Sequence, residues 1–588
     1  MPEYSTKLYD LSTGESITSL IPFSSPRDEY RAAFENRSLP FLNYYTIQNA
    51  EVKKETLTRG EFWDLACAAA ACLSKRGLSK GDRTVHCFSS NSIYDLVFRL
   101  ASILVGYVPV TINWQADSNE TIIYKANLTE ARLVLYDEDF ASRVEEIKSK
   151  LTSVLFLEAR QVEGYPADSK FTSQPLSYND ERMIIFTSGT TGKPKGVSLS
   201  HRSYLTNRLT FEQYFGTSQN TQLDLLLVNP LHHTNSSALS DWGTRRGGTI
   251  IHLLQRYTTA YWRILLEVAS KKRDLLVAPV VSRHIDFLES LSAQSKLPIE
   301  EAKLKEALSR TDILIGSAPV GPTTIRRISR FSNRLPHVRF GSTENCLQVM
   351  ATPTTMPQNE IMRAFEAGWS HRYKGEKLVG YYIGREHFPF TRVKVVKAID
   401  PESKDYFRTC EIGEPGYLVT QGANVMSGYV GDAEVTKAVF KEGWYTGLRD
   451  IAFALENEKD RELDYYWVSR DSALLIRGGA NYAYDQIAAE LSRLLIEHFQ
   501  LRPEQFQLAV VGLRLESEHE DSCCVTIELS EDAMYVESQL KASFIEKAAK
   551  MISKGARPDY VRFGRIPRSF KGGILYPQLK QDFLDSLN

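Results

Sequence analysis

The stretch that decides the fold class and the chemistry is Phe186-Thr-Ser-Gly-Thr-Thr-Gly-Lys-Pro-Lys-Gly196. It begins at the end of a short apolar run, Ile184-Ile185-Phe186, which predicts a buried strand. Glycines let the backbone turn its N–H groups towards an anion, and small hydroxyls add further donors. The stretch therefore predicts a phosphate-binding loop, and its candidate residues are Thr187, Ser188, Gly189, Thr190, Thr191, Gly192 and Lys195.

A loop rich in glycine, serine and threonine can also be an ordinary surface turn. This one is not a Walker A loop, because Gly192-Lys193 is followed by Pro194. The choice between a phosphate site and a plain turn therefore depends on the rest of the chain.

Around this loop, helical and strand-like segments alternate, which predicts an α/β fold with a largely parallel sheet up to about residue 450. Segment 61–76 places apolar side chains on one helical face, and segments 84–88 and 95–104 read as a strand and a helix. The chain has 588 residues, more than one hydrophobic core usually organises. We expect a large domain over residues 1–469 and a smaller α+β domain over residues 470–588.

Composition excludes several classes of protein. The net charge is −1 and no stripe of Lys and Arg is visible, so we expect no nucleic-acid partner. The seven cysteines show no disulfide or zinc spacing. No signal peptide and no apolar run long enough to span a bilayer is visible, so a cytoplasmic location and no transmembrane segment are expected.

The loop resembles the signature loop of the adenylate-forming superfamily, which includes acyl-CoA synthetases, luciferases and the adenylation domains of peptide synthetases. Further motifs follow that family's order, namely Leu78–Arg83, Asn229–His233, Gly316–Pro319 and Phe340–Glu344. The resemblance implies a large N-terminal AMP-binding domain and a smaller mobile C-terminal domain. It also implies ATP and Mg²⁺, a small-molecule carboxylic acid that becomes an acyl-AMP, and a thiol acceptor, for which coenzyme A is the leading choice.

The resemblance also assigns roles to single residues. Thr343 would contact the α-phosphate, and Glu344 would help to hold Mg²⁺, an ion that prefers hard oxygen ligands. His233 would border the acyl pocket, although a lone histidine at the end of a strand is often structural. The adenine and acyl site would be lined by Ala318, Phe340 and Gly341.

Two further motifs are assigned to the nucleotide, and the first of them departs from the family pattern. The family has Thr-Gly-Asp, with the aspartate on the ribose, whereas here Leu448-Arg449 stand between Thr446-Gly447 and Asp450. We assign the ribose to Asp450, with a capping aspartate as the alternative. Arg470 resembles the hinge arginine that contacts the nucleotide, with a surface charge as the alternative.

The most consequential departure lies near the C-terminus. The family has a Gly-Lys pair whose lysine offsets charge in the transition state, but here Gly573 occupies the lysine position. Lys571 lies two residues earlier, and residues two apart share a face of an extended chain. We expect Lys571 to substitute, with a slow or lost adenylation step as the alternative.

Three functions remain open at this point. The first is an ATP-dependent acid–thiol ligase that makes an acyl-AMP and then an acyl-CoA. The second passes the acyl group to an external carrier protein or an amine. The third is a nucleotide-binding protein with impaired catalysis, suggested by Gly573 and by the altered Thr-Gly-Asp motif.

Overall fold

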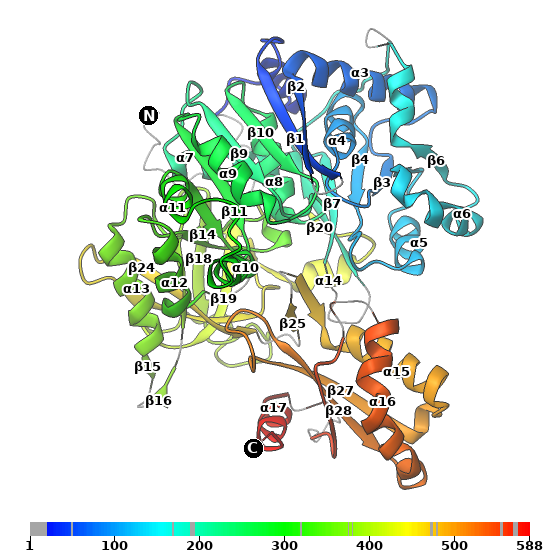
Figure 1. Ribbon diagram of the computed structural model, residues 1–588, viewed down its shortest axis with the longest axis vertical. Helices are drawn as coiled ribbons and strands as arrows, with labels where there is room; N and C mark the ends of the chain where they lie inside the picture. Colours follow the sequence, from blue (N-terminus) through cyan, green and yellow to red (C-terminus); the bar gives the residue numbers. More distant parts are fainter. Residues whose placement is uncertain are drawn as a thin grey trace.

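The structure is a computed structural model, and it describes residues 20–48, 51–166, 170–187, 194–317, 320–373, 376–378, 380–470, 474–477, 480–552, 555, 557–567, 574 and 576–587. Figure 1 shows a large upper part, coloured blue to yellow, and a smaller lower part in orange and red. The elements alternate between helix and strand over most of the large part, so the predicted α/β class is confirmed.

The first sheet carries the predicted phosphate loop. Within the described residues it has seven strands, in the order β20 (Gly428–Tyr429), β8 (Lys195–Ser200), β7 (Glu181–Thr187), β4 (Val108–Thr111), β3 (Arg83–Cys87), β5 (Leu133–Tyr136) and β6 (Leu155–Glu158). The strands from β7 to β6 pair in parallel, and β8 and β20 add antiparallel pairs at the edge. Strand β7 therefore ends, at Thr187, at the carboxyl edge of the parallel strands, where α/β proteins bind ligands.

The second sheet is larger, with a parallel half and an antiparallel half. The parallel half consists of β1 (Pro40–Gln48), β10 (Thr249–Leu254), β9 (Leu223–Leu227), β11 (Leu275–Val280), β12 (Asp312–Ile315) and β13 (His337–Phe340), with β2 (Glu51–Thr58) antiparallel at the edge. Its strands read as continuous apolar runs because both faces are covered.

The antiparallel half was not predicted from the sequence. It contains β14 (Met350–Ala351), β17 (Tyr381–Glu386), β18 (Thr391–Val396), β19 (Gly416–Gly422), β21 (Phe440–Lys441), β22 (Trp444–Tyr445), β23 (Asp450–Glu456) and β24 (Leu463–Arg470). Strand β18 alternates buried and partly exposed residues, as expected for a sheet with one solvated face. The expectation of a largely parallel sheet as far as residue 450 is thus wrong beyond β13.

Helices fill the space between the two sheets and cover their outer faces. The inner layer contains α3 (Arg59–Lys75), α4 (Ile93–Val105), α7 (His201–Phe215) and α8 (Thr234–Thr244), whose apolar side chains share one core with both sheets. Helices α5 (Asn119–Leu128) and α6 (Ala141–Lys150) cover the outer face of the first sheet. The outer face of the second is covered by α9 (Ala260–Ala269), α10 (Ser282–Ala293), α11 (Glu301–Ser309), α12 (Pro322–Phe331) and α13 (Gln358–Ser370). Helix α3 confirms the helix predicted at 61–76, and it begins earlier because Thr58 and Glu61 form a capping box.

The C-terminal unit has a core of its own, built from residues between Leu475 and Phe583. It contains the hairpin β25 (Leu474–Arg477) and β26 (Ala480–Ala483), a sheet of β27 (Phe506–Leu513), β28 (Ser522–Leu529) and β29 (Tyr560–Phe563), and the helices α15 (Tyr484–Phe499), α16 (Glu537–Met551) and α17 (Tyr576–Asp585). Helix α15 and strands β27 and β28 confirm the elements predicted there. The smaller C-terminal α+β domain is therefore confirmed as a fold, while its mobility stays a prediction.

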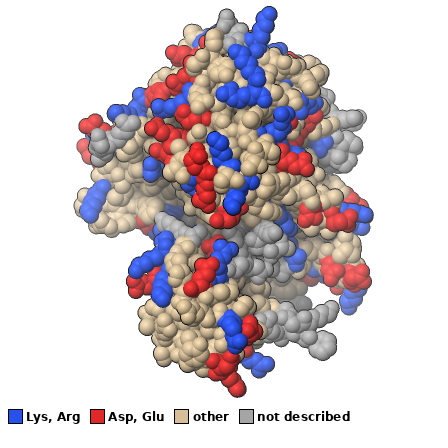
Figure 2. All heavy atoms as spheres, turned by 90° about the vertical axis from the view of Figure 1, so that its right-hand side faces the viewer, with Lys and Arg blue, Asp and Glu red and all other residues tan. Residues whose placement is uncertain are grey.

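Polar contacts join the two units on one side of the molecule. Arg283 of α10 (Ser282–Ala293) forms an ion pair of 2.5 Å with Glu520, and the Thr324 hydroxyl of α12 (Pro322–Phe331) lies 2.8 Å from Nε2 of His519. On the face that Figure 2 shows, acidic and basic side chains are interspersed over both units. Within the described residues, no helix has the length and apolar character needed to cross a membrane.

Candidate active site

A cavity of about 950 Å³ lies between the two sheets and the C-terminal unit. Seven of the predicted site residues line it, namely Thr187, Lys195, His233, Phe340, Gly341, Thr343 and Glu344. The C-terminal unit contributes one face of α15 and Tyr482 of the β25–β26 hairpin. The predicted residues Ser188, Gly189, Thr190, Thr191, Gly192, Ala318 and Lys571 lie outside the described residues.

The ends of the predicted phosphate loop lie opposite each other. Strand β7 ends at Thr187 and β8 begins at Lys195, and these two residues pair across the antiparallel strands. Both residues line the cavity, and we call the antiparallel pair of strands β7 and β8 the phosphate hairpin. The ammonium of Lys195 lies 5.1 Å from the centre of the Tyr429 ring, a cation–π contact that places its charge beside β20.

Helix α5 supports both ends of this hairpin. The Tyr124 hydroxyl donates a 3.3 Å hydrogen bond to the carbonyl of Pro194, and the ammonium of Lys125 lies 4.8 Å from the centre of the Phe186 ring. Lys125 is also paired with Asp117 at 2.5 Å, and both side chains are buried at the cavity wall. Sequence reasoning missed this pair, because a single lysine in an amphipathic helix carries no signal of its own.

The turn after β13 brings Thr343 and Glu344 to the cavity. Gly341 is required there, since a β-carbon at this position would lie 1.4 Å from the carbonyl oxygen of Leu347. The Thr343 hydroxyl accepts a 2.9 Å hydrogen bond from Thr234 at the start of α8. The turn is thus fixed to the helix that follows the predicted histidine motif.

Glu344 lies close to the phosphate hairpin. Its Oε1 accepts a 3.2 Å hydrogen bond from the Tyr429 hydroxyl, and Tyr429 pairs with Val197 of β8. The cavity thus combines a carboxylate with the hydroxyls of Thr187 and Thr343. Hard oxygen donors of this kind suit Mg²⁺, which is usually held by one or two carboxylates together with substrate phosphates. The residues present therefore fit a magnesium ion that arrives with ATP.

His233 caps the N-terminal end of α8 with its backbone and lies at the cavity wall. Burial, reinforced by the nearby charge of Lys125, lowers its pKa to about 4. The imidazole is therefore neutral at pH 7 and can accept or donate a hydrogen bond without adding charge. Its ring packs against that of His232, with 4.3 Å between the ring centres.

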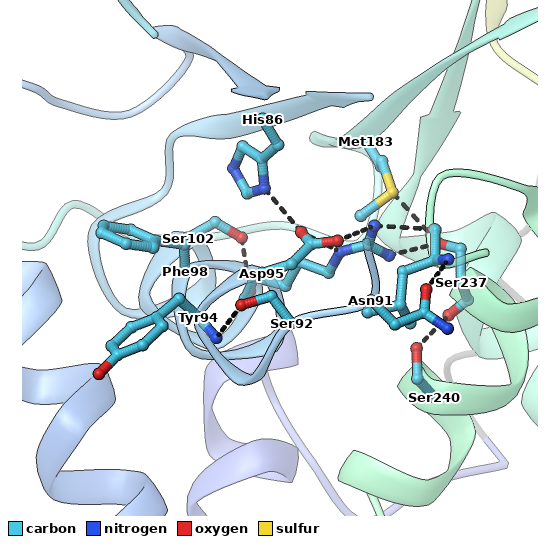
Figure 3. Close-up of polar contacts among 12 residues, drawn as sticks. His86, Asn91, Ser92, Tyr94, Asp95, Phe98, Ser102, Met183, Ser237 and Ser240 are labelled. Carbon is cyan, nitrogen blue, oxygen red and sulfur yellow. Dashed lines mark hydrogen bonds and ion pairs between the residues drawn. The ribbon is translucent and has the colours of Figure 1, made fainter. Parts of the chain in front are cut away.

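The segment 228–233 that carries His233 is held by buried side chains of α4 and of the segment before it. Figure 3 shows Asp95 and Asn91 of this network, with His86 and Ser237 near them. Arg99 forms a bidentate pair with Asp95, at 2.9 and 3.0 Å, and donates to the carbonyl of Leu231 at 2.8 Å and to Ser237 at 3.1 Å. Asp95 in turn accepts a 2.8 Å hydrogen bond from Nδ1 of His86. His233 is thus positioned, through its segment 228–233, by the buried pair of Arg99 and Asp95, which the sequence did not reveal.

Asn91 holds the same segment from its other end. Its amide nitrogen donates to the carbonyls of Asn229 and Leu254, at 3.2 and 3.0 Å, and its oxygen accepts from the backbone N–H of Leu231 at 2.8 Å. Asn91 is 2% exposed, so these bonds are shielded from water.

Comparison with known proteins identifies the family of the chain. Residues 34–430 match the family model described as AMP-binding enzyme. The chain belongs to the AMP-binding enzyme family. The adenylate-forming identity predicted from the motifs is therefore confirmed.

The AMP-binding relatives include a luciferin 4-monooxygenase of Photuris pensylvanica, 24% identical over 91% of this chain and 91% of the relative. A mitochondrial medium-chain acyl-CoA ligase of Bos taurus is 25% identical over 88% of this chain and 82% of the relative. Among solved structures, a double mutant of o-succinylbenzoate CoA synthetase from Bacillus subtilis has a TM-score of 0.72 at 18% identity, covering 94% of this chain and 97% of that one. An amide bond synthetase from Marinactinospora thermotolerans has a TM-score of 0.71 at 17% identity, covering 94% and 99%.

Two predicted contacts remain, Asp450 and Arg470, and neither is among the described residues that line the cavity. Asp450 and Arg470 are direct neighbours across strands β23 and β24. The Asp450 side chain is 1% exposed and accepts a 3.0 Å hydrogen bond from the indole of Trp467. Arg449, which has a φ of 55°, lines the cavity in its place. The roles of Asp450 and Arg470 at the ribose stay predictions.

Proposed function

We propose that this protein is an ATP-dependent acid–thiol ligase, which converts a carboxylic acid to an acyl-AMP and transfers the acyl group to coenzyme A. The observation that carries the proposal is the meeting of Thr187, Lys195, Thr343 and Glu344 at one cavity that His233 also borders. Those residues come from three separate parts of the chain. Family membership supports the reaction class, and this convergence supports the choice of the cavity as the active site.

In the first half-reaction, a carboxylate oxygen attacks the α-phosphorus of ATP and pyrophosphate leaves. The phosphate hairpin and Lys195 hold the polyphosphate, and the Thr343 hydroxyl orients the α-phosphate. Magnesium, held by Glu344 and the phosphates, would offset charge on the phosphate oxygens. Neutral His233 borders the acid and adds no charge that would compete for the triphosphate. Lys571 would offset charge on the reacting carboxylate and α-phosphate.

In the second half-reaction, the thiolate of coenzyme A attacks the acyl carbonyl and AMP leaves. The stretch Ile476–Asn481 resembles the loop that several acyl-CoA ligases bring to the active site for this step. Tyr482, the next residue, belongs to β26 and lines the cavity. We propose that the unit from residue 470 onwards rotates between the two half-reactions, a hinge motion that lets one cavity serve both.

The first experiment is carboxylate-dependent exchange between ATP and pyrophosphate over a panel of acids, with wild type and Lys571→Ala. Exchange that collapses in the variant supports adenylation and the role of Lys571. Exchange that is unchanged keeps adenylation but contradicts that role. Binding of ATP with no exchange for any acid would favour a nucleotide-binding protein with impaired catalysis.

Formation of AMP that depends on coenzyme A then identifies the acceptor. AMP formation with an amine or with a carrier protein, but not with coenzyme A, would favour the second function considered above.

A further inference from the structure

One buried arginine of the cavity, Arg339, has no acidic partner among the described residues. Arg339 lies on β13, directly before the Phe340–Glu344 turn, and its side chain lines the cavity although the residue is only 6% exposed. Its Nη1 is buried and donates to no acceptor within the described residues. Its titratable neighbour there is Tyr214 rather than a carboxylate.

Other buried arginines of the same domain are ion-paired or hydrogen-bonded, and Arg59, for which the described residues offer no carboxylate partner, donates to three backbone carbonyls. Arg99 is paired with Asp95, and Arg245 contacts both Asp241 and Glu29. A buried charge without a partner costs several kcal/mol, so folded proteins rarely retain one for stability alone. Burial lowers the pKa of Arg339 to about 10, which still leaves the guanidinium charged at neutral pH. Arg339 is therefore a buried positive charge that the folded chain does not neutralise among the described residues.

The wall beside Arg339 is shaped to admit its side chain. A β-carbon on Gly316 would lie 3.2 Å from Cγ and 3.3 Å from Nε of Arg339, so the glycine leaves the path of the side chain open. Gly316 also lines the cavity, in the turn that the family motif places along the acyl group. The guanidinium thus lies against the wall expected for the acid, whereas Thr187, Lys195 and Glu344 make up the phosphate end.

A second buried polar group faces the same cavity. Asn235, in the first turn of α8, is 7% exposed, and its amide oxygen has no hydrogen-bond partner within the described residues. Helix α8 also starts without a side-chain cap, so its first N–H groups point towards the cavity end of the helix. An amide and a helix N-terminus are both groups that can donate to a carboxylate.

We propose that Arg339 binds a second anionic group of the acid substrate, so that the enzyme activates one carboxylate of a dicarboxylic acid while the other pairs with the guanidinium. The planar guanidinium can donate two parallel hydrogen bonds to a carboxylate, which gives the pair both strength and direction. This inference rests on the proposed function and names its substrate class. No bond forms or breaks at Arg339, which stays protonated throughout.

The test compares linear dicarboxylates with the monocarboxylates in which a methyl group replaces the distal carboxylate, in wild type, Arg339→Met and Arg339→Lys. In wild type, kcat/KM for pyrophosphate exchange should be at least about tenfold higher for the best dicarboxylate than for its matched monocarboxylate. Arg339→Met should abolish this preference and leave KM for ATP within about twofold, while Arg339→Lys should restore part of it. Wild type that prefers monocarboxylates, or a variant that loses ATP binding instead, would overturn the proposal.

Thermal unfolding provides a second test, which does not depend on activity. Because Arg339 has no acidic partner, Arg339→Met should leave Tm unchanged or raise it, whereas Arg99→Met should lower Tm because Asp95 loses its partner. If no acid supports exchange, the proposed function fails. The role of Arg339 is then decided by the binding of a dicarboxylate, measured as a shift of Tm. A dicarboxylate that raises Tm of wild type but not of Arg339→Met would support the site, and no shift with any dicarboxylate would refute it.

Discussion

The hydroxyl of Tyr429 donates a 3.2 Å hydrogen bond to Oε1 of Glu344 and so connects the phosphate hairpin to the carboxylate that we assign to magnesium. The same hydroxyl lies 3.1 Å from that of Tyr445. Burial and the charge of Glu344 raise the pKa of Tyr429, so the phenol keeps its proton and remains a donor. The orientation of the Glu344 carboxylate therefore depends on Tyr429, which lies outside the Phe340–Glu344 motif.

Replacing Tyr429 with Phe removes this hydrogen bond and keeps the ring that lies over Lys195. A hydrogen bond to a charged group contributes about 1.5–3 kcal/mol, so we expect kcat/KM for pyrophosphate exchange to fall by about tenfold or more. The apparent affinity for Mg²⁺, measured by titrating the exchange rate, should fall with it. A variant with unchanged magnesium dependence would show that Tyr429 does not orient Glu344.

Gly341→Ala would force a β-carbon into the carbonyl oxygen of Leu347 and displace the turn that carries Thr343 and Glu344. A displacement of about 1 Å at a positioning residue can lower a rate about a hundredfold, and we expect a loss of that order in exchange. Gly164→Ala is a matched control, since a β-carbon at that position meets no atom within 4 Å. Equal activity of the two variants would contradict the tight packing of the turn.

Arg99 should affect the acid more than the nucleotide. In Arg99→Lys the charge opposite Asp95 is kept, but one ammonium cannot reach Asp95, Ser237 and the Leu231 carbonyl at once. KM for the acid should rise by about tenfold while KM for ATP stays within about twofold. Faster hydrogen exchange in peptides that cover residues 228–236 would report the loosened segment directly.

Arg245→Lys is the control for Arg99→Lys, because Arg245 is also a buried arginine paired four residues away on its helix, with Asp241. Its hydrogen bonds go to Asp241 and Glu29 rather than to the segment before α8. An equal rise of the acid KM in both variants would point to general destabilisation instead of positioning.

Several buried histidines should make the protein less stable in mild acid. Burial lowers the pKa of His233 to about 4 and those of His284 and His387 to about 3, from an ordinary value of 6.5. The unfolded chain then binds more protons than the folded one as pH falls below 6.5, so the free energy of unfolding decreases in that direction. Tm measured from about pH 7 to about pH 4 should fall, and a flat or rising Tm would contradict the burial of these rings.

Asp95 acts in the same sense as these histidines, but at lower pH. Although burial alone would raise it, the charges of Arg99 and His86 lower the pKa of Asp95 to about 2. Its stabilisation is therefore present above its ordinary pKa of 3.8 and is lost only as pH falls towards 2.

The contribution of one histidine to the pH dependence can be tested by substitution. His284→Phe, which preserves the stacked contact with Tyr257, should reduce the slope of Tm between about pH 7 and pH 4.

The sequence predicted those parts of the site that are encoded in short motifs. Thr187, Lys195, Thr343 and Glu344 lie at one cavity because each motif directly follows or begins a strand whose end faces it. Their order along the chain was enough to predict the convergence.

The residues that support these motifs could not be predicted in the same way. Arg99 contacts a carbonyl 132 positions further along the chain, and the role of Arg339 depends on the lack of a nearby acid rather than on a pattern. The antiparallel strands beyond β13 were missed because short strands with one solvated face carry a weak periodic signal.

Detection of an enzyme-bound acyl-adenylate tests the central claim most directly. The protein is mixed with ATP, Mg²⁺ and an acid that supports pyrophosphate exchange, without coenzyme A, and the quenched mixture is analysed by mass spectrometry. We predict an acyl-AMP in amounts close to those of the enzyme, which disappears with release of AMP and acyl-CoA when coenzyme A is added. Accumulation of ADP or of an acyl phosphate without any acyl-AMP would contradict the account.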